Sequence, residues 1–268
     1  MISRTVLLFL GLAICLPVSA EVVTEELTYR QGDTVMHGML AYDNAVSGKR
    51  PGILVVHEWW GQNDYPRDRA RMLAALGYTA LAVDMYGEGR TATHPDDAGK
   101  FAGAVGGNLP LARARFEAAL EALRAQPTVA ADDIAAIGYC FGGGVVINMA
   151  RLGTDIDGVV SYHGSLATSQ PAASGAVKTR VLVFNGADDP LVKAEQIEAF
   201  KQEMDAAGAD YTFINYPGAV HGFTNPGADA KGKEFGLPLA YDAEADKDSW
   251  TRTQAFFKEI FSLSLIHI

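Results

Sequence analysis

The chain has 268 residues and a formal net charge of −10, and no repeat or low-complexity segment interrupts it. Nucleic acid and anionic membrane surfaces repel a strongly acidic chain that has no compensating basic run. We therefore predict no nucleic-acid or membrane partner for the mature protein. A diffusible small molecule is the expected partner, bound by a monomer or a homodimer.

Residues 1–20 have the pattern of a cleavable secretory signal peptide. Arg4 precedes an apolar run that ends near Val18, and Ala20 closes a cleavage site of small residues. Cys15 follows an isoleucine rather than a small residue, which argues against a lipoprotein anchor. We therefore predict a secreted or periplasmic protein whose fold begins after residue 20.

The mature chain is short enough to form one α/β domain. Removing the 20 leader residues from 268 leaves 248. We predict a single domain over residues 21–262. Residues 263–268 are predicted to be a tail of unknown role. Cys140 is the one cysteine that remains. Because a lone cysteine cannot close an intramolecular disulfide, it is an intermolecular bridge, an inert buried thiol or a reactive thiol.

Short apolar segments along the chain predict β-strands. Alternating residues on both sides of "QGDT" at 31–34 indicate an antiparallel hairpin at the edge of a sheet. The later runs are continuously apolar and rich in branched residues, which favours strands buried on both faces of a mostly parallel sheet. These strands are predicted near residues 53–56, 79–83, 134–137, 159–162, 180–184 and 211–216.

Helical patterns fill the intervals between these strands. Gly77 and Gly208 follow two of the helices as C-terminal signals, and Asn108 precedes a third as its cap. The alternation of strands and helices predicts an α/β fold with a mostly parallel central sheet and helices on both faces. The predicted helices cover residues 64–76, 109–124, 143–150, 194–207 and 250–261.

Gly138, Cys140 and Gly142 form the pattern glycine-x-nucleophile-x-glycine between a predicted strand and a predicted helix. Such a strained turn needs small residues on either side of the nucleophile, because larger ones would collide with the neighbouring strand or helix. Cys140 would project from the carboxyl edge of the sheet beside the positive end of the helix, which favours the thiolate. An inert buried cysteine in a glycine-rich turn is the alternative.

A cysteine nucleophile requires a base and a group that orients the base. His221 follows the last predicted strand, and Asp188 and Asp189 follow the strand before it. These positions suit the chain order nucleophile, acid, histidine. His57 and His163 fit less well, because His57 precedes the cysteine and His163 follows an internal strand. The alternatives are a surface loop for His221 and a helix cap for one aspartate.

The loop after the strand at 53–56 supplies further candidates. The backbone N–H of Trp59 in this loop and that of Phe141, beside the cysteine, would form an oxyanion hole. Glu58 lies among aromatic residues, where desolvation would raise its pKa. The alternative for Glu58 is a structural ion pair with Arg67, Arg69 or Arg71.

Five motifs carry a resemblance that covers essentially the whole mature chain. They are "HEWWG" at 57–61, "DMYGEG" at 84–89, "GYCFGG" at 138–143, "NGADDPLV" at 185–192 and "YPGAVHGF" at 216–223. Together and in this order they resemble the dienelactone hydrolase family of α/β-hydrolases. The resemblance implies an α/β-hydrolase fold with an N-terminal antiparallel hairpin, and it implies no metal and no organic cofactor.

The resemblance also implies roles for individual residues. It places a catalytic triad on Cys140, Asp189 and His221, since the family's acid lies three residues before a valine that matches Val192. It implies that Glu58 helps to deprotonate the cysteine when substrate arrives. The expected reaction is attack of the thiolate on an ester or lactone carbonyl, followed by hydrolysis of an acyl thioester with His221 as base.

Two positions depart from the family members that cleave dienelactone, which bind the substrate carboxylate with arginines. The corresponding positions here are Glu88, with Arg90 nearby, and Asn225. Because a glutamate would repel a carboxylate, we predict a different small ester or lactone as the substrate. We expect its pocket to be lined by Trp60, Tyr86, Tyr139, Phe223 and Asn225.

Two other functions would use the same residues. One is a redox-sensing or ligand-binding protein without hydrolytic activity, in which Cys140 is the reactive thiol. The other is an acyltransferase, which passes the acyl group to an acceptor other than water. The ordered motifs favour a carboxylic ester hydrolase.

Overall fold

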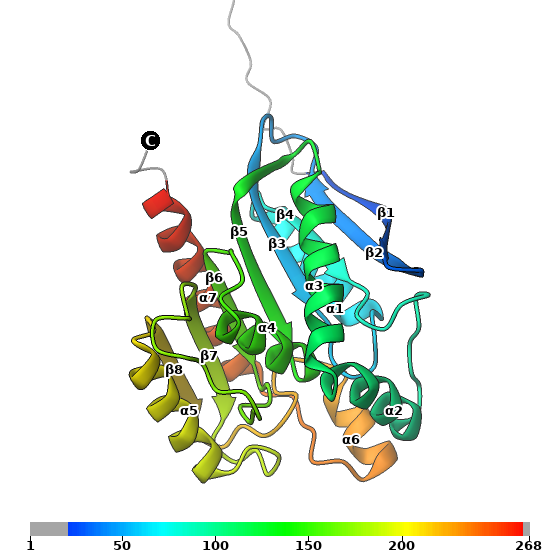
Figure 1. The fold of residues 1–268 in the computed structure, drawn as a ribbon. Helices are drawn as coiled ribbons and strands as arrows, with labels where there is room; N and C mark the ends of the chain where they lie inside the picture. The colour runs from blue at the N-terminus through cyan, green and yellow to red at the C-terminus, as the bar shows by residue number, and fades with distance from the viewer. Residues whose placement is uncertain (1–20, 265–268) are drawn as a thin grey trace, which may run out of the picture.

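The computed structural model describes residues 21–264, and a single eight-stranded sheet forms its centre (Figure 1). The predicted signal peptide and residues 265–268 of the predicted tail lie outside the described residues. The strands lie in the order β1-β2-β4-β3-β5-β6-β7-β8. Their bounds are β1 (Val22–Gln31), β2 (Thr34–Asp43), β3 (Arg50–Val56), β4 (Thr79–Val83), β5 (Val129–Tyr139), β6 (Gly158–Tyr162), β7 (Arg180–Gly186) and β8 (Tyr211–Tyr216).

The sheet is parallel except at its N-terminal edge. Strand β2 pairs antiparallel with β1 and with β4, whereas the remaining neighbours pair in parallel. The predicted edge hairpin is therefore confirmed. The parallel register places Val56 beside Gly138 and Tyr139 beside Tyr162, so the carboxyl ends of the central strands meet at one edge. The loops that carry the predicted reactive residues leave the sheet at this edge.

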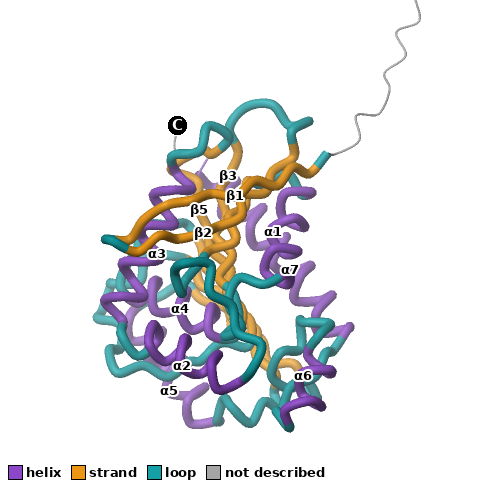
Figure 2. Tube along the Cα trace, turned by 90° about the vertical axis from the view of Figure 1, so that its right-hand side faces the viewer, coloured by secondary structure: helices purple, strands orange, loops and turns teal. Residues whose placement is uncertain are grey.

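Helices cover both faces of the sheet. Helices α1 and α7 lie on one side, and α3 and α4 lie on the other (Figure 2). Helix α6 lies beyond the carboxyl ends of the strands (Figure 1). The bounds are α1 (Asp64–Ala75), α2 (Pro95–Gly106), α3 (Leu109–Arg124), α4 (Phe141–Arg151), α5 (Ala194–Ala207), α6 (Ala228–Phe235) and α7 (Ala243–Ser264).

Strand β3 shows why its sequence is continuously apolar. Ile53 and Val55 belong to the core that also contains Phe257 of α7, whereas Leu54 belongs to the core that contains Phe116 of α3. Because successive side chains of a strand point to opposite faces, a strand covered on both sides needs apolar residues at every position. The prediction of a sheet buried on both faces is confirmed.

Three helices differ from the predicted ranges, and the first is α2, which has no counterpart among them. Helix α7 begins at Ala243 rather than at residue 250, because the Asp242 carboxylate accepts hydrogen bonds from the backbone of Glu244 and Ala245 and caps a polar first turn. It also continues to Ser264, into the predicted tail. Helix α6 is not predicted, because it is short and has no periodic apolar face. Within residues 21–264, none of the helices combines the length and apolar character that crossing a membrane requires.

Candidate active site

Cys140 occupies a tight turn between β5 and α4. Its backbone angles are φ 53° and ψ −113°, and its N–H donates to the Tyr162 carbonyl (3.0 Å) and to Nδ1 of His163 (3.2 Å). A Cβ added at Gly138 would lie 2.1 Å from the Gly142 oxygen, and one added at Gly142 would lie 2.3 Å from the Val56 oxygen. The turn therefore requires glycine at both positions, as its sequence indicates. It places the thiol at the N-terminus of α4, where the helix dipole favours negative charge.

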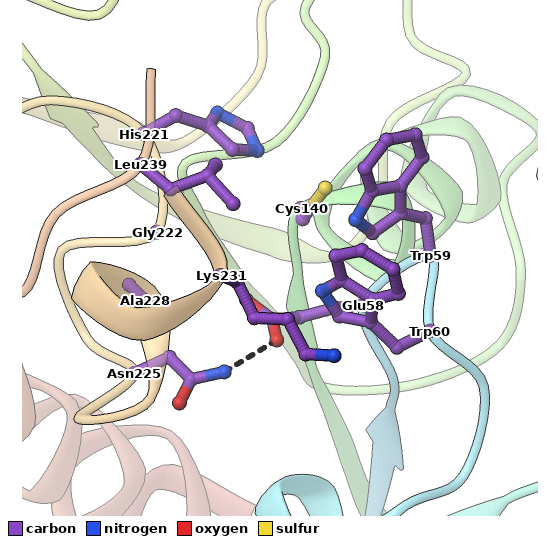
Figure 3. Close-up of a pocket in the computed structure, with 10 residues that line it drawn as sticks. All are labelled: Glu58, Trp59, Trp60, Cys140, His221, Gly222, Asn225, Ala228, Lys231 and Leu239. Carbon is purple, nitrogen blue, oxygen red and sulfur yellow. Dashed lines mark hydrogen bonds between the residues drawn. The ribbon is translucent and has the colours of Figure 1, made fainter. Parts of the chain in front are cut away.

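His221 reaches Cys140 from the loop after β8. Its imidazole is directed toward the sulfur (Figure 3), and its Nδ1–H donates to Oδ2 of Asp189 at 2.7 Å. Burial opposes protonation of the ring, but the charge of the Cys140 sulfur and the bond to Asp189 outweigh it and raise the pKa of His221 to about 10. An imidazolium at this position stabilises a thiolate beside it.

Asp189, and not Asp188, binds the imidazole. Asp189 is buried and its second carboxylate oxygen accepts the Leu191 N–H at 2.8 Å, whereas Asp188 is exposed. The alternative that one aspartate caps the following helix is wrong, because α5 begins after Lys193, which occupies the cap position. The hydrogen bonds of Asp189 hold it in place to orient His221.

Glu58 lies in a polar recess on one side of Cys140. Asn225 donates to its carboxylate at 2.6 Å (Figure 3). Burial raises the pKa of Glu58 to about 6, although the hydrogen bond from Asn225 opposes the shift. The alternative of an ion pair between Glu58 and a neighbouring arginine is wrong. The arginines pair elsewhere: Arg67 with Glu26, Arg69 with Asp246 and Arg71 with Asp68.

The backbone N–H groups of Phe141 and Trp59 lie on the two segments that meet at Cys140. Neither donates a hydrogen bond to another residue within 21–264. The Tyr86 hydroxyl donates to the Trp59 carbonyl at 2.9 Å and so holds the loop. Asp84 in turn organises the segment that carries Tyr86, because its carboxylate accepts the backbone N–H groups of residues 37, 86, 87 and 89. These two amide groups therefore remain the candidate donors for an oxyanion.

Two cavities meet at Cys140. The smaller one is the polar recess, lined by Glu58, Trp60, Asn225 and Lys231. The larger one has a volume of about 420 Å³ and an almost entirely apolar lining. Residues Trp59, Cys140, His221 and Leu239 line both. The sulfur thus lies between a polar and an apolar compartment.

Two of the five residues predicted to line the substrate pocket lie at a cavity beside Cys140, and three do not. Trp60 and Asn225 line the recess. Tyr86, Tyr139 and Phe223 line neither cavity at Cys140, because each is at most 2 % exposed and packs within the protein interior. Tyr139 and Phe223 are close to Cys140 and His221 along the chain, but their rings point into the core between the sheet and α7.

Glu88 also differs from its expected place. It is exposed, and its carboxylate accepts the Val35 N–H at 3.2 Å in the edge hairpin. It lines neither cavity at Cys140. The expected repulsion between Glu88 and a substrate carboxylate therefore has no basis in the structure.

His163 and His57 support the site from positions that sequence reasoning ranked low. The His163 ring is fully buried with its centroid 5.1 Å from that of His221, and its Nε2 lies 2.9 Å from the Thr224 hydroxyl. Burial lowers the pKa of His163 well below its ordinary value, so the ring is neutral and its Nδ1 accepts the Cys140 N–H. The His57 carbonyl accepts the Gly142 N–H at 3.0 Å. The positive φ of 40° at His163 is visible only in the structure.

Lys231 is a further site residue that the sequence did not indicate, because it lies on the unpredicted α6. Its Nζ lies 4.8 Å from the ring centroid of Trp60 and 5.3 Å from that of Phe235. Over residues 21–264, no group of three or more His, Cys, Asp or Glu side chains is arranged to hold a metal ion.

Comparisons with known proteins agree with the motifs. The model of the dienelactone hydrolase family matches residues 36–261. A solved structure of a dienelactone hydrolase-like promiscuous phosphotriesterase from metagenomic libraries is 37% identical, has a TM-score of 0.85 and is matched over 89% of this chain and 98% of its own. An α/β-hydrolase enzyme from a deep-sea metagenome library shares the fold, with a TM-score of 0.65 at 16% identity over 91% of this chain and 100% of its own.

A sequence relative extends the same picture. A protein of Synechocystis sp., provisionally named a carboxymethylenebutenolidase, is 26% identical over 255 residues, which are 90% of this chain and 98% of the relative. The predicted α/β-hydrolase fold is confirmed by the structural likeness. Because the family model spans most of the chain and all five motifs lie where the fold brings them together, the chain belongs to the dienelactone hydrolase family.

Proposed function

We propose that this member of a hydrolase family cleaves small carboxylic esters or lactones with Cys140 as the nucleophile. The observation that carries the proposal is the 2.7 Å hydrogen bond between His221 and Asp189, together with the direction of the imidazole toward the sulfur (Figure 3). A nucleophile, a base that faces it and an acid that orients the base are the groups that covalent acyl transfer requires. Cys140 at the turn before α4 completes this set.

The first half of the reaction forms an acyl thioester. The Cys140 thiolate attacks the carbonyl carbon, the carbon–sulfur bond forms, and the carbonyl electron pair moves to oxygen. The N–H groups of Phe141 and Trp59 stabilise this oxyanion. When the tetrahedral adduct collapses, the bond to the alcohol oxygen breaks, and that oxygen takes the proton from the His221 imidazolium.

The second half releases the acid. Neutral His221 removes a proton from water as the water oxygen attacks the thioester carbonyl. Collapse of the second adduct breaks the carbon–sulfur bond and returns the thiolate beside an imidazolium. Asp189 keeps the same nitrogen of His221 facing the reaction in both halves, because its hydrogen bond occupies Nδ1.

Glu58 lies close enough to this chemistry to influence the proton of the cysteine. It lines the same recess as Cys140, and burial raises its pKa to about 6. A carboxyl group with this pKa exchanges a proton readily near neutral pH. We therefore propose that, where Cys140 is present as the thiol, Glu58 assists its deprotonation when substrate enters, and the thiolate then reacts as described above.

The test of the proposed function is hydrolysis of p-nitrophenyl acetate by the wild-type protein and by Cys140→Ala. We expect the variant to lose activity entirely and the wild type to form an acyl adduct on Cys140 that mass spectrometry detects after rapid quenching. Retention of activity in the variant would overturn the mechanism. Oxidation of Cys140 without an acyl adduct would support a redox sensor, and acylation without release to water would support an acyltransferase.

We further propose that the chain is exported and cleaved after Ala20, a proposal that rests on the leader pattern of residues 1–20. Expression of the full chain in a bacterial host, followed by fractionation and N-terminal sequencing, tests it. We expect the mature N-terminus to be Glu21 in the periplasmic fraction. An intact Met1 in the cytoplasmic fraction would contradict export.

A further inference from the structure

The larger cavity at Cys140 is apolar, and the proposed mechanism assigns no role to it. Its volume of about 420 Å³ falls within the range of pockets that hold small organic ligands. Helix α2, the turn at Cys140, the loop after β7 and the segment after α6 all contribute to it. Its apolar walls include Ala102, Phe141, Leu191, Val192, Leu237 and Leu239.

The cavity offers no partner for a charge. Apart from Cys140 and His221, which the reaction occupies, its lining contains no ionisable side chain, and Ser165 contributes the one hydroxyl. The ionisable groups near the sulfur, Glu58 and Lys231, line the recess on the other side. Because a carboxylate that is buried without a partner loses its hydration, this cavity selects against a charged group.

Leu191 at this cavity is unusual for its exposure. The residue is 56 % exposed, the highest value among the exposed large hydrophobic residues within 21–262. Its backbone is held by the Asp189 carboxylate, so the side chain is kept beside the site. Leu191 therefore extends the apolar lining of the cavity to the protein surface.

The segment after α6 also holds apolar side chains in position over the cavity. Leu239 forms a β-bridge with His221, and the Ala240 N–H donates to the His221 carbonyl at 3.2 Å. The base and the wall of the cavity are therefore joined by backbone hydrogen bonds. A substrate in this cavity lies against both the imidazole and the sulfur.

We infer that the substrates are uncharged esters that place an extended apolar group in this cavity. The inference rests on the proposed function, since it names the substrate class of the same site. It differs from the charged substrate that arginine-bearing members of the family bind. The scissile carbonyl lies at Cys140, and the apolar group extends toward α2 and Leu191.

Two substrate series test the inference with the wild-type protein. One series lengthens the acyl chain of p-nitrophenyl esters from acetate to octanoate, and the other lengthens the alcohol of alkyl acetates. We expect kcat/KM to rise in one of the two series by roughly fourfold for each methylene that becomes buried. In that series, a carboxylate at the end of the chain should lower kcat/KM at least about tenfold. For the acyl series, the matched pair is the mono-p-nitrophenyl ester of adipic acid and p-nitrophenyl hexanoate.

A matched pair of variants links the preference to the cavity. Ala102→Trp places a large side chain in the wall, whereas Ala104→Trp introduces the same residue on the same helix at an exposed position that lines neither cavity at Cys140. We expect Ala102→Trp to reduce the ratio of kcat/KM for the long ester to that for the short ester by about tenfold or more. Ala104→Trp should leave this ratio as in the wild type.

The outcomes separate the inference from the proposed function. If the protein hydrolyses acetate through Cys140 but neither series rises, or if both tryptophan variants change the ratio equally, the inference is wrong and the proposed function stands. If a chain with a terminal carboxylate is preferred, the inference is also wrong. If no ester is hydrolysed in either series, the proposed ester hydrolysis fails, and the inference fails with it.

Discussion

The hydrogen bond between Asp189 and His221 determines which imidazole nitrogen faces Cys140. Because Nδ1–H donates to the carboxylate, Nε2 is the nitrogen directed at the sulfur. The negative charge of Asp189 also stabilises the imidazolium, since the bond is among the causes of the raised pKa of His221. One carboxylate thus controls both the orientation and the protonation of His221.

Replacing this carboxylate should therefore impair catalysis without removing any reacting group. We expect Asp189→Asn to lower kcat on the order of 10²- to 10⁴-fold, because an amide neither fixes the tautomer nor stabilises the imidazolium. It should also lower the pKa of His221, which NMR titration of the ring measures. Asp188→Asn is the matched control, and this exposed residue should leave both quantities near their wild-type values. Equal effects of the two substitutions would contradict the assignment.

Glu58 makes the stability of the protein depend on pH. Burial raises its pKa from 4.5 to about 6, so between these pH values the folded protein binds more protons than the unfolded chain. The stability contribution is therefore fully present below about pH 4.5 and is lost as pH rises through 6. The difference between a pKa of 4.5 and a pKa of about 6 corresponds to about 2 kcal/mol.

Glu58→Gln should remove this dependence. We expect the free energy of unfolding of the variant, relative to that of the wild type, to increase by about 2 kcal/mol between pH 4.5 and pH 7.5. Urea unfolding of both proteins across this range measures it, and the comparison cancels other titrating groups such as Asp157, whose pKa burial also raises. A difference that does not vary with pH would show that Glu58 is not desolvated in solution.

The connection between β5 and α4 depends on how closely the backbone packs at the turn. Gly138 leaves no room for a methyl group, because the Gly142 carbonyl already occupies that space. Gly99 within α2 provides the opposite case, since a Cβ there has no neighbour within 4 Å. The same substitution should therefore have opposite effects at the two positions.

We expect Gly138→Ala to destabilise the protein by about 1–3 kcal/mol, because the backbone must shift to admit the methyl group. Gly99→Ala should stabilise it by about 0.5–1 kcal/mol, because alanine restricts the unfolded chain and favours the helix. Chemical denaturation measures both values. Similar effects of the two substitutions would show that the turn relaxes at little cost.

Elements with strong patterns were predictable, and weak ones were not. The strands at 79–83 and 211–216 match β4 and β8, because continuous apolar or alternating residues specify a strand wherever it is covered. Helix α6 was not predicted, because the residues that it buries, Ala228 and Gly232, are small and form no periodic apolar face. Its position depends on contacts with the site segments and not on its own periodicity. Lys231 was missed as a site residue for the same reason, since it lies on this helix.

At the scale of the whole molecule, Arg69 joins distant segments. It donates to the Thr224 carbonyl at 2.7 Å and to the Asp246 carboxylate, and thereby links α1 to the loop of His221 and to α7. The guanidinium also lies over the rings of Tyr65, Tyr139 and Trp250. These contacts of the buried guanidinium hold the loop that carries His221 against α1 and α7.

Removing Arg69 should consequently cost far more than removing an exposed arginine. We expect Arg69→Ala to destabilise the protein by about 3–5 kcal/mol, because Asp246 is left largely buried and unpaired. Arg252→Ala breaks an exposed pair with Asp248 on α7 and should cost less than about 1 kcal/mol. Urea unfolding of both variants tests the contrast. Comparable losses would mean that solvent screens the Arg69 pair as well.

The sequence alone specified the fold class, the turn at Cys140 and the chain order of cysteine, aspartate and histidine, whereas the choice of Asp189 over Asp188 required the structure. These features are local, because glycine spacing and apolar runs act through neighbouring residues. The cavity walls, the partner of Glu58 and the places of Tyr139 and Phe223 required the three-dimensional arrangement. Residues adjacent in a chain can point to opposite sides of a sheet, and residues far apart, such as Glu58 and Asn225, meet only when the strands align their carboxyl ends.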